Sequence, residues 1–325
     1  MDPAANSIDD KQNVSCEGSG CAVLVHPSSE AEQPGRRGQD QPTSGIITKS
    51  GIKARRIESP SSINTFKQCP RKYFYQYIMK YPTAFNIHTV LGGVCHSVLE
   101  IFFDQDVRSY TDLDFAAAFQ GKIQELLMSE WSGAKPKLAQ LGITHDQERF
   151  YFEEAALMLL NWGDKFSAKI RAYPGGFQEA YAALTPTREK EYKSMSMSVR
   201  GFIDVIEKTG PNVRLMDYKT SKRFEMNHEY KLQLSIYALM YQEEHGQLPT
   251  HVGLYFLKDP YQFEYVLPVD QDLLDHARVE IDVMHMNTQS NNIVDYPKKV
   301  TALCKWSTGQ CDFYGRCFNK ECQGN

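Results

Sequence analysis

Two aspartates and a lysine lie close together in the middle of the sequence, on two segments that predict a β-hairpin. The apolar segments 199–206 and 213–218 flank a Thr-Gly-Pro-Asn turn. Asp204 lies in the first segment, and Asp217 ends the second, two residues before Lys219. Because side chains alternate along a strand, Asp217 and Lys219 share one face. Unpaired buried charge is costly, so converging carboxylates predict a site for a hard divalent cation, Mg²⁺ or Mn²⁺.

A D-x-K tripeptide alone is weak evidence, because such tripeptides also occur on solvated strand ends. The next helix, expected from near His228, places Gln233 and Tyr237 four residues apart on one face. In this order, G-x-x-D (Gly201 and Asp204), D-x-K and Q-x-x-x-Y resemble the motifs of the RecB-like branch of the PD-(D/E)XK nuclease superfamily, of the AddB and CRISPR-associated exonuclease type. The resemblance implies an α/β fold like that of restriction endonucleases, with a mixed sheet flanked by helices, a helical amino-terminal part and a cysteine-rich carboxy-terminal segment.

A helix expected over 91–104 carries His96 and Glu100 four residues apart. Its G-x-x-x-H-x-x-L-E pattern is similar to the first motif of the same nucleases, which implies that His96 is a metal ligand. Glu100 is a weaker candidate, for which pairing with a nearby base is the alternative. Glu191, on a strand expected before the hairpin, is interpreted as a solvated acid.

The resemblance implies a site for one or two Mg²⁺ or Mn²⁺ ions. The implied ligands are His96, Asp204, Asp217 and the backbone carbonyl of Tyr218. Lys219 would position or help to deprotonate the attacking water and offset the charge of the scissile phosphate. Gln233 and Tyr237 would orient Lys219 or the DNA backbone.

Four of the eight cysteines gather near the carboxyl end, at Cys304, Cys311, Cys317 and Cys322. In a reducing compartment, a bound metal or cluster is a more natural use of them than disulfides. The segment 61–73 resembles the amino-terminal helix of RecB-like nucleases, in which a cysteine often joins a cluster. This pattern implies a [4Fe-4S] cluster on Cys69, Cys304, Cys311 and Cys317. Zn²⁺ on the four carboxy-terminal cysteines is the alternative, and Thr308 stands where many family members carry a further cysteine.

The segment 51–80 combines seven basic residues with interleaved aromatics and a single acid, Glu58. Such a mixture suits a nucleic-acid strand, with cations on phosphates and rings under bases. We interpret the aromatic residues mainly as core, and Arg71 and Lys72 as DNA contacts. Ser61 or Ser62 is expected to cap the first helix.

The composition bounds the class of protein. Of the 325 residues, 42% are hydrophobic, which is ample for a core, and no apolar run approaches the roughly 20 residues of a membrane span. The amino terminus lacks a secretory apolar region, so we expect an intracellular protein, in the cytoplasm of a microbial or phage-infected cell, that is neither secreted nor bound to a membrane. The net charge of −4 gives no whole-chain signature of nucleic-acid binding, so DNA contacts must come from local patches.

The domain organisation follows the changes in composition. Residues 1–50 are rich in Ser, Gly, Gln and Pro and predict a disordered tail. A nuclease domain is expected over 51–325, with a helical insertion at about 105–175, a nuclease core at about 186–290 and the cysteines at 304–322.

Three functions remain open at this point. The first is a metal-dependent DNA nuclease, an exonuclease in preference to an endonuclease, acting on single-stranded DNA or on DNA with free ends. The second is a nuclease subunit that works only with a helicase or another recombination or CRISPR-type protein, since the chain carries no G-x-x-x-x-G-K-[ST] loop for an ATP motor. The third is a non-catalytic DNA-binding scaffold of the same fold.

Overall fold

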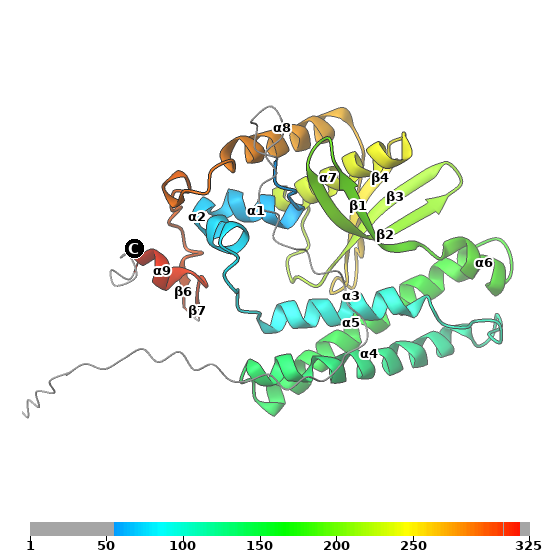
Figure 1. Cartoon of the computed structure of the whole chain (residues 1–325). Coiled ribbons are helices and arrows are strands. Elements are labelled where there is room, and N and C mark those ends of the chain that lie inside the picture. The colour runs from blue at the N-terminus through cyan, green and yellow to red at the C-terminus, as the bar shows by residue number, and fades with distance from the viewer. Residues whose placement is uncertain (1–54, 308, 319–325) are drawn as a thin grey trace, which may run out of the picture. The chain divides into compact units, whose positions relative to one another are not determined.

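The computed structural model describes residues 55–307 and 309–318, and both the predicted tail at 1–50 and Cys322 lie outside them. The described chain is a mixed sheet with helices on both faces (Figure 1). The helices are α1 (Pro60–Gln68), α2 (Pro70–Tyr73), a π-helical turn (Phe74–Ile78), α3 (Ile87–Phe102), α4 (Phe115–Gln140), α5 (His145–Ala172), α6 (Phe177–Leu184), α7 (His228–His245), α8 (Gln271–Asn287), a 3-10 turn (Ile293–Asp295) and α9 (Tyr314–Phe318). The strands are β1 (Thr187–Ser194), β2 (Val199–Thr209), β3 (Asn212–Lys219), β4 (His251–Phe256), β5 (Glu264–Pro268), β6 (Lys305–Trp306) and β7 (Gly309–Gln310).

The main sheet has five strands in the order β1-β2-β3-β4-β5. All neighbours are antiparallel except β3 and β4, which are parallel and are joined by α7. A parallel pair needs such a crossover, and the amphipathic segment after the D-x-K motif supplies it. The predicted hairpin and the predicted α/β fold class with a mixed, helix-flanked sheet are both confirmed.

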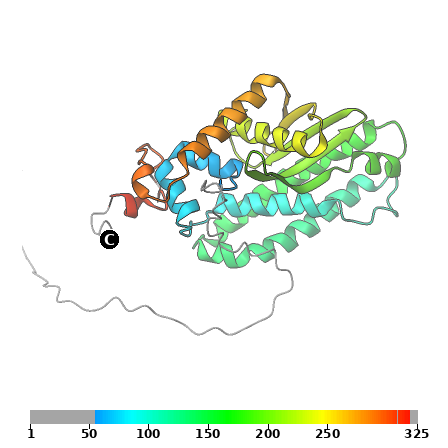
Figure 2. The same cartoon turned by 45° about the horizontal axis from the view of Figure 1, so that its top comes forward.

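Each face of the sheet is covered by its own hydrophobic cluster. On one face, helices α3 to α6 pack their aromatic side chains, among them Phe102 and Trp162, against Val205, Met216 and Tyr218. On the other face, α7 and α8 cover residues of β2, β3 and β4. Figures 1 and 2 show α3, α4 and α5 side by side below the sheet, with α7 and α8 on its opposite side. The helical segment before the sheet therefore forms one complete covering layer.

The first helix begins two or three residues earlier than a cap at Ser61 or Ser62 would place it, so the predicted cap is wrong. Ser59 is the cap: its Oγ accepts a hydrogen bond from the backbone N–H of Ser62 at 3.1 Å. Pro60 occupies the first helical position, where its missing N–H costs nothing. The Ser62 side chain in turn accepts from the backbone N–H of Ser59 at 2.8 Å, which completes a capping box.

The carboxy-terminal segment returns to the amino-terminal helices. The ring of Tyr296 lies 6.1 Å from that of Tyr73 and 5.1 Å from that of Phe74, and Phe313 lies 5.3 Å from Tyr75. Tyr73, Phe74 and Tyr75 are buried, which confirms the interpretation of these aromatics as core. Among the helices of the described residues, none has the length and apolar character that crossing a membrane requires.

Glu58 fastens the first helix to the sheet. Its backbone N–H donates to the carbonyl of Ser198, and its carbonyl accepts from the N–H of Arg200. The Glu58 side chain is buried, and its carboxylate accepts from Tyr73 Oη at 2.5 Å and from Ser62 Oγ at 2.6 Å. Burial, followed by this carboxylate, raises the pKa of Tyr73, so the hydroxyl keeps its proton and remains a donor.

We expect Tyr73→Phe to lower the free energy of unfolding by about 1.5–3 kcal/mol, because a buried carboxylate loses a hydrogen bond. Urea denaturation measures the change. Tyr192→Phe is the matched control: Tyr192 is buried in the same cluster, but its hydroxyl contacts the imidazole of His245 at 3.0 Å. This variant should lose only about 0.5–1.5 kcal/mol. Equal losses in the two variants would contradict the role of Glu58.

Candidate metal centre

The candidate site lies where β2 and β3 separate. Their antiparallel pairing ends with Val205 opposite Met216, and the next residues are Asp204 on β2 and Asp217 on β3. Past this point β2 stays paired with β1 and has one isolated bridge, from Val199 to Glu58, whereas β3 stays paired with β4. The backbone N–H of Tyr218 donates to Asp204 Oδ2 at 2.9 Å, so a carboxylate takes the place of a ladder carbonyl. We call this point, where the two aspartates face each other, the fork.

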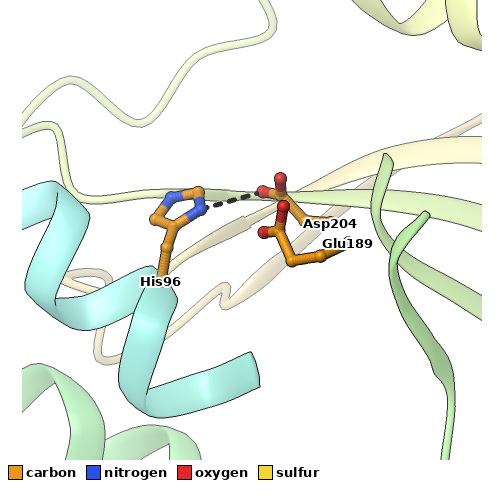
Figure 3. Close-up of side chains that lie close together, drawn as sticks. All are labelled: His96, Glu189 and Asp204. Atoms are coloured by element: carbon orange, nitrogen blue, oxygen red, sulfur yellow. Dashed lines mark ion pairs between the residues drawn. The ribbon is translucent and has the colours of Figure 1, made fainter. Parts of the chain in front are cut away.

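Three side chains from three elements meet at the fork. Figure 3 shows His96 on α3, Glu189 on β1 and Asp204 on β2 pointing toward one another. One possible ligand atom from each lies within 4.8 Å of the other two. His96 Nδ1 is 3.3 Å from Asp204 Oδ2, and His96 Nε2 is 3.0 Å from the carbonyl oxygen of Tyr218. The structure thus brings His96 together with Asp204 and the Tyr218 carbonyl, as predicted, and adds Glu189. Asp217, the other predicted ligand, is not a member of this group of possible ligands.

The ionisation of this group leaves room for a cation. Burial lowers the pKa of His96, although the Asp217 carboxylate opposes the shift, so the ring is neutral near pH 7 and carries one N–H. If Nε2 donates that proton to the Tyr218 carbonyl, the lone pair of Nδ1 faces Asp204. Burial, and next the Asp217 carboxylate, raises the pKa of Asp204. Two electron-pair donors facing each other need either a proton or a cation between them.

Asp217 pairs with the D-x-K lysine. It is 2% exposed, and its Oδ2 lies 2.5 Å from Lys219 Nζ. Burial alone would lower the pKa of Lys219, but the Asp217 carboxylate outweighs it and the pKa is raised. Lys219 is therefore a protonated cation. Within the described residues, Asp217 Oδ2 accepts no hydrogen bond of normal geometry, because its contact with Lys219 is an ion pair only.

Gln233 joins the two halves of the pair. Its Oε1 accepts from Lys219 Nζ at 3.0 Å, and its Nε2 donates to Asp217 Oδ1 at 2.7 Å and to Tyr237 Oη at 2.8 Å. Both protons of the amide and its oxygen are thus used. Burial raises the pKa of Tyr237 well above its ordinary value, so its hydroxyl stays neutral. The Q-x-x-x-Y residues accordingly orient the D-x-K residues.

Gly201 allows α7 to approach the fork. A Cβ atom at this position would lie 3.0 Å from Tyr237 Cε1 and 3.2 Å from Met240 Cε. Both distances are shorter than ordinary contacts, so a side chain would push α7 away from β2. The glycine of the G-x-x-D motif is therefore needed for packing, whereas its aspartate supplies the carboxylate.

The donor set fits a hard divalent cation. It combines carboxylate oxygens, a neutral imidazole and a backbone carbonyl, which are ligands of Mg²⁺ and Mn²⁺ sites. The structural sign of this fit is the group formed by His96, Glu189 and Asp204, whose possible ligand atoms lie within 4.8 Å of one another. The residues that would hold the ion are Asp204, Asp217, His96 and the carbonyl of Tyr218, with Glu189 beside them.

The fork opens into a cavity of about 930 Å³. Four cations line it, namely Lys219, Lys222, Arg223 and Lys258. Lys222 and Lys258 both pair with Glu154, at 3.4 and 3.1 Å. Arg223 is exposed, and it forms no ion pair with any acid among the described residues. Arg223 is therefore the cation of this cavity that can contact an anionic ligand without leaving an ion pair, and the acid Glu225 lines the cavity as well.

Glu189 is the residue that sequence reasoning missed. In the pairing of β1 with β2, Arg188 is opposite Val205 and Lys190 is opposite Ile203. Glu189, which lies between them, is therefore opposite Asp204. Its φ of 43° is left-handed, which no local pattern predicts for a glutamate. The sequence offered one signal for this residue, namely an acid in the strand expected before the hairpin.

The other acids considered from the sequence lie elsewhere. Glu191 is exposed, 4.0 Å from Arg200, as its solvated interpretation predicts. Glu100 is exposed too, and it lies outside the group of possible metal ligands formed by the described residues.

Four cysteines surround a second, smaller cavity. They are Cys69, Cys304, Cys311 and Cys317. Cys69 lies between α1 and α2, whereas the other three come from the carboxy-terminal segment, where the N–H of Cys311 donates to the carbonyl of Cys304 at 2.9 Å. Burial raises the pKa of the Cys311 and Cys317 thiols.

Arg71 and Lys72, the predicted DNA contacts, lie on the cysteine side and not in the lining of the fork cavity. Arg71 Nε donates to the carbonyl of Tyr296 at 2.6 Å. Lys72 lines the cysteine cavity together with Lys298 and Lys299.

Comparison with known proteins identifies a family and shows weak similarity to solved structures. No curated protein matches the sequence. A crystal structure described as a candidate exonuclease from Eubacterium rectale is similar at 9% identity with a TM-score of 0.43, over 82% of this chain and 92% of that chain, which is too low to carry over an activity. The family model of the PD-(D/E)XK nuclease superfamily matches residues 58–318, which span every described element from α1 to α9. The chain therefore belongs to the PD-(D/E)XK nuclease superfamily.

Proposed function

We propose that this protein is a divalent-metal-dependent deoxyribonuclease that hydrolyses phosphodiester bonds at the fork. The observation that carries the proposal is the convergence of His96, Glu189 and Asp204, whose possible ligand atoms all lie within 4.8 Å of one another. The buried ion pair of Asp217 and Lys219 lies beside this group. Such an arrangement is costly for folding alone and useful for holding a cation. Membership of a nuclease superfamily supports the same conclusion.

The residues take distinct parts in the proposed reaction. Asp204, Asp217, His96 and the carbonyl of Tyr218 would hold Mg²⁺ or Mn²⁺, which supplies an activated water and charge neutralisation when bound. Lys219, kept protonated by Asp217, offsets negative charge on the scissile phosphate and positions the water. Gln233 and Tyr237 hold Lys219 and Asp217 in place through the amide bridge.

The mode of cleavage belongs to the proposal as well. We propose exonuclease action on single-stranded DNA or on DNA with free ends, in keeping with the resemblance to RecB-like nucleases. Circular single-stranded DNA tests this mode, because an exonuclease leaves it intact while it degrades the same molecule once linearised. A requirement for a helicase or another recombination or CRISPR-type protein would appear as cleavage only after that partner is added.

We expect Asp217→Ala to lower the cleavage rate of end-labelled DNA by about 10²–10³-fold or more, because the loss of a metal ligand removes several kcal/mol of charge stabilisation. DNA binding, measured by fluorescence anisotropy, should change little. Glu191→Gln is the control, because it removes an exposed acid of β1 and should leave the rate unchanged. Retained cleavage by Asp217→Ala would contradict the assignment. Failure of the wild-type protein to cleave with either ion would favour the scaffold function.

A second expectation concerns the metal-free protein. The pKa of Asp204 is higher in the folded protein than in the unfolded chain, where it is about 4. Protonated Asp204 therefore favours the folded state at low pH, and this contribution to the free energy of unfolding is lost as the pH rises through the folded pKa. Asp204→Asn should therefore raise the melting temperature by a few degrees at pH 7 in EDTA and have no effect near pH 4. Mg²⁺ should stabilise the wild type and not this variant. A variant that melts no higher than wild type at pH 7 would contradict the charge repulsion.

The cysteine cavity is the second part of the proposed function. We propose that Cys69, Cys304, Cys311 and Cys317 hold a [4Fe-4S] cluster, which would fasten the carboxy-terminal segment to the first two helices. The four residues line one small cavity, and they come from the amino-terminal helices and from the carboxy-terminal segment. Lys72, Lys298 and Lys299 would offset the charge of the thiolates.

We expect Cys69→Ser to lose the visible absorbance and the bound iron of protein purified without oxygen. Cys95→Ala is the control, because Cys95 is a buried cysteine of α3 outside this cavity, and this variant should keep its iron. The zinc alternative uses Cys322, which lies outside the described residues, and predicts one zinc that survives Cys69→Ser. A metal assay separates the two without any measurement of activity.

A further inference from the structure

We propose that Phe202 is a stacking platform for an unpaired base, which makes single-stranded DNA, or the unpaired end of a duplex, the preferred substrate of the fork. This inference rests on the proposed function. It adds Phe202, which occupies a variable position of the G-x-x-D motif and is not a metal ligand, with a role in choosing the substrate and none in the chemical step.

The position of Phe202 relative to the metal centre is the first argument. Phe202 lies on β2 two residues before Asp204, about 7 Å along a strand. It lines the same cavity as Asp204, Asp217 and Lys219. A nucleotide whose phosphate reaches the fork therefore has its base within reach of this ring.

The exposure of the ring is the second argument. Phe202 is 51% exposed, and among the described residues it is the one large hydrophobic side chain that combines such exposure with a place in the lining of this cavity. Single exposed apolar residues are common on protein surfaces and need no explanation there. An exposed ring inside a polar cavity is different, because the ring loses contact with water only when a ligand covers it. Such a contact would stabilise the complex with the ligand.

The strand geometry explains why the ring is available. On one side β2 pairs with β1 through Phe202 and beyond. On the other side, pairing with β3 begins only at Val205, and the isolated bridge to Glu58 lies at Val199. Phe202 thus lies in the stretch of β2 between these two contacts, which within the described part of the chain pairs with β1 alone.

The charges around the cavity agree with a nucleotide as the occupant. Lys219 and the exposed Arg223 can take phosphate oxygens on the side of the fork, while the ring takes the base. Stacking on an aromatic side chain tolerates any base sequence, because every base offers a flat face. In an intact duplex, however, the faces of the bases are covered by their neighbours. The arrangement therefore selects for unpaired nucleotides without selecting for sequence.

The test compares Phe202→Ala, Phe202→Trp and Phe150→Ala with the wild type. Phe150 is the matched control, because it is 50% exposed on α5 and lies outside the fork cavity. The substrates are a fluorescein-labelled single strand, the same strand with abasic residues at its end, and the blunt duplex. Cleavage is measured as kcat/KM with Mn²⁺, and binding is measured by anisotropy with Ca²⁺.

We expect Phe202→Ala to lose about tenfold on the single strand, with Trp restoring the rate and Phe150→Ala leaving it unchanged. On the abasic strand the wild type should lose a similar factor, and Phe202→Ala should lose little more, because ring and base act as one contact. Equal rates for wild type and Phe202→Ala on the intact single strand would overturn the proposal. So would a substitution effect on the abasic strand as large as that on the intact strand. If the wild type cleaves no DNA, the proposed function fails, and the affinities still decide the stacking: equal binding by wild type and Phe202→Ala overturns it.

Discussion

Two carboxylates buried at one point repel each other, and much of the structure around the fork counteracts this repulsion. Burial and the Asp217 charge together raise the pKa of Asp204, so its ionised form is unfavourable without a cation. Lys219 supplies one positive charge, and the Gln233 amide fixes its position. This arrangement stabilises the metal-free protein only in part. In the proposed function, this residual repulsion would favour the binding of a divalent ion, and the site would lose stability in exchange for that binding.

The parts of the site that could be predicted from the sequence are those held together by local geometry. Asp217 and Lys219 share a strand face through the two-residue period, and Gln233 and Tyr237 share a helix face through the four-residue spacing. The crossover helix then needs only to pack on its own strand for the four to meet. The hairpin and most helices could be predicted for the same reason, because their signals lie within a few residues.

The parts that could not be predicted depend on contacts between distant segments. Glu189 reaches the fork only because β1 pairs with β2 in one particular register and takes a left-handed φ there. Ser59 replaces the expected cap because Glu58, its neighbour, is pinned to β2. Arg71 is basic and was therefore predicted to meet DNA, yet its side chain donates to a carbonyl of the carboxy-terminal segment, whose path no local pattern reveals.

The fork also has a consequence for association between molecules. A strand with unpaired backbone groups is normally a place where another chain can add itself, and native sheets protect such edges. Here the uncovered stretch of β2 is enclosed between the bridge of Glu58 at one end and the first pair with β3 at the other. A second protein strand would need several consecutive residues of open edge in order to pair, and this gap is interrupted at both ends. The sheet is thus open at the fork without offering an edge long enough for another strand to pair with and begin aggregation.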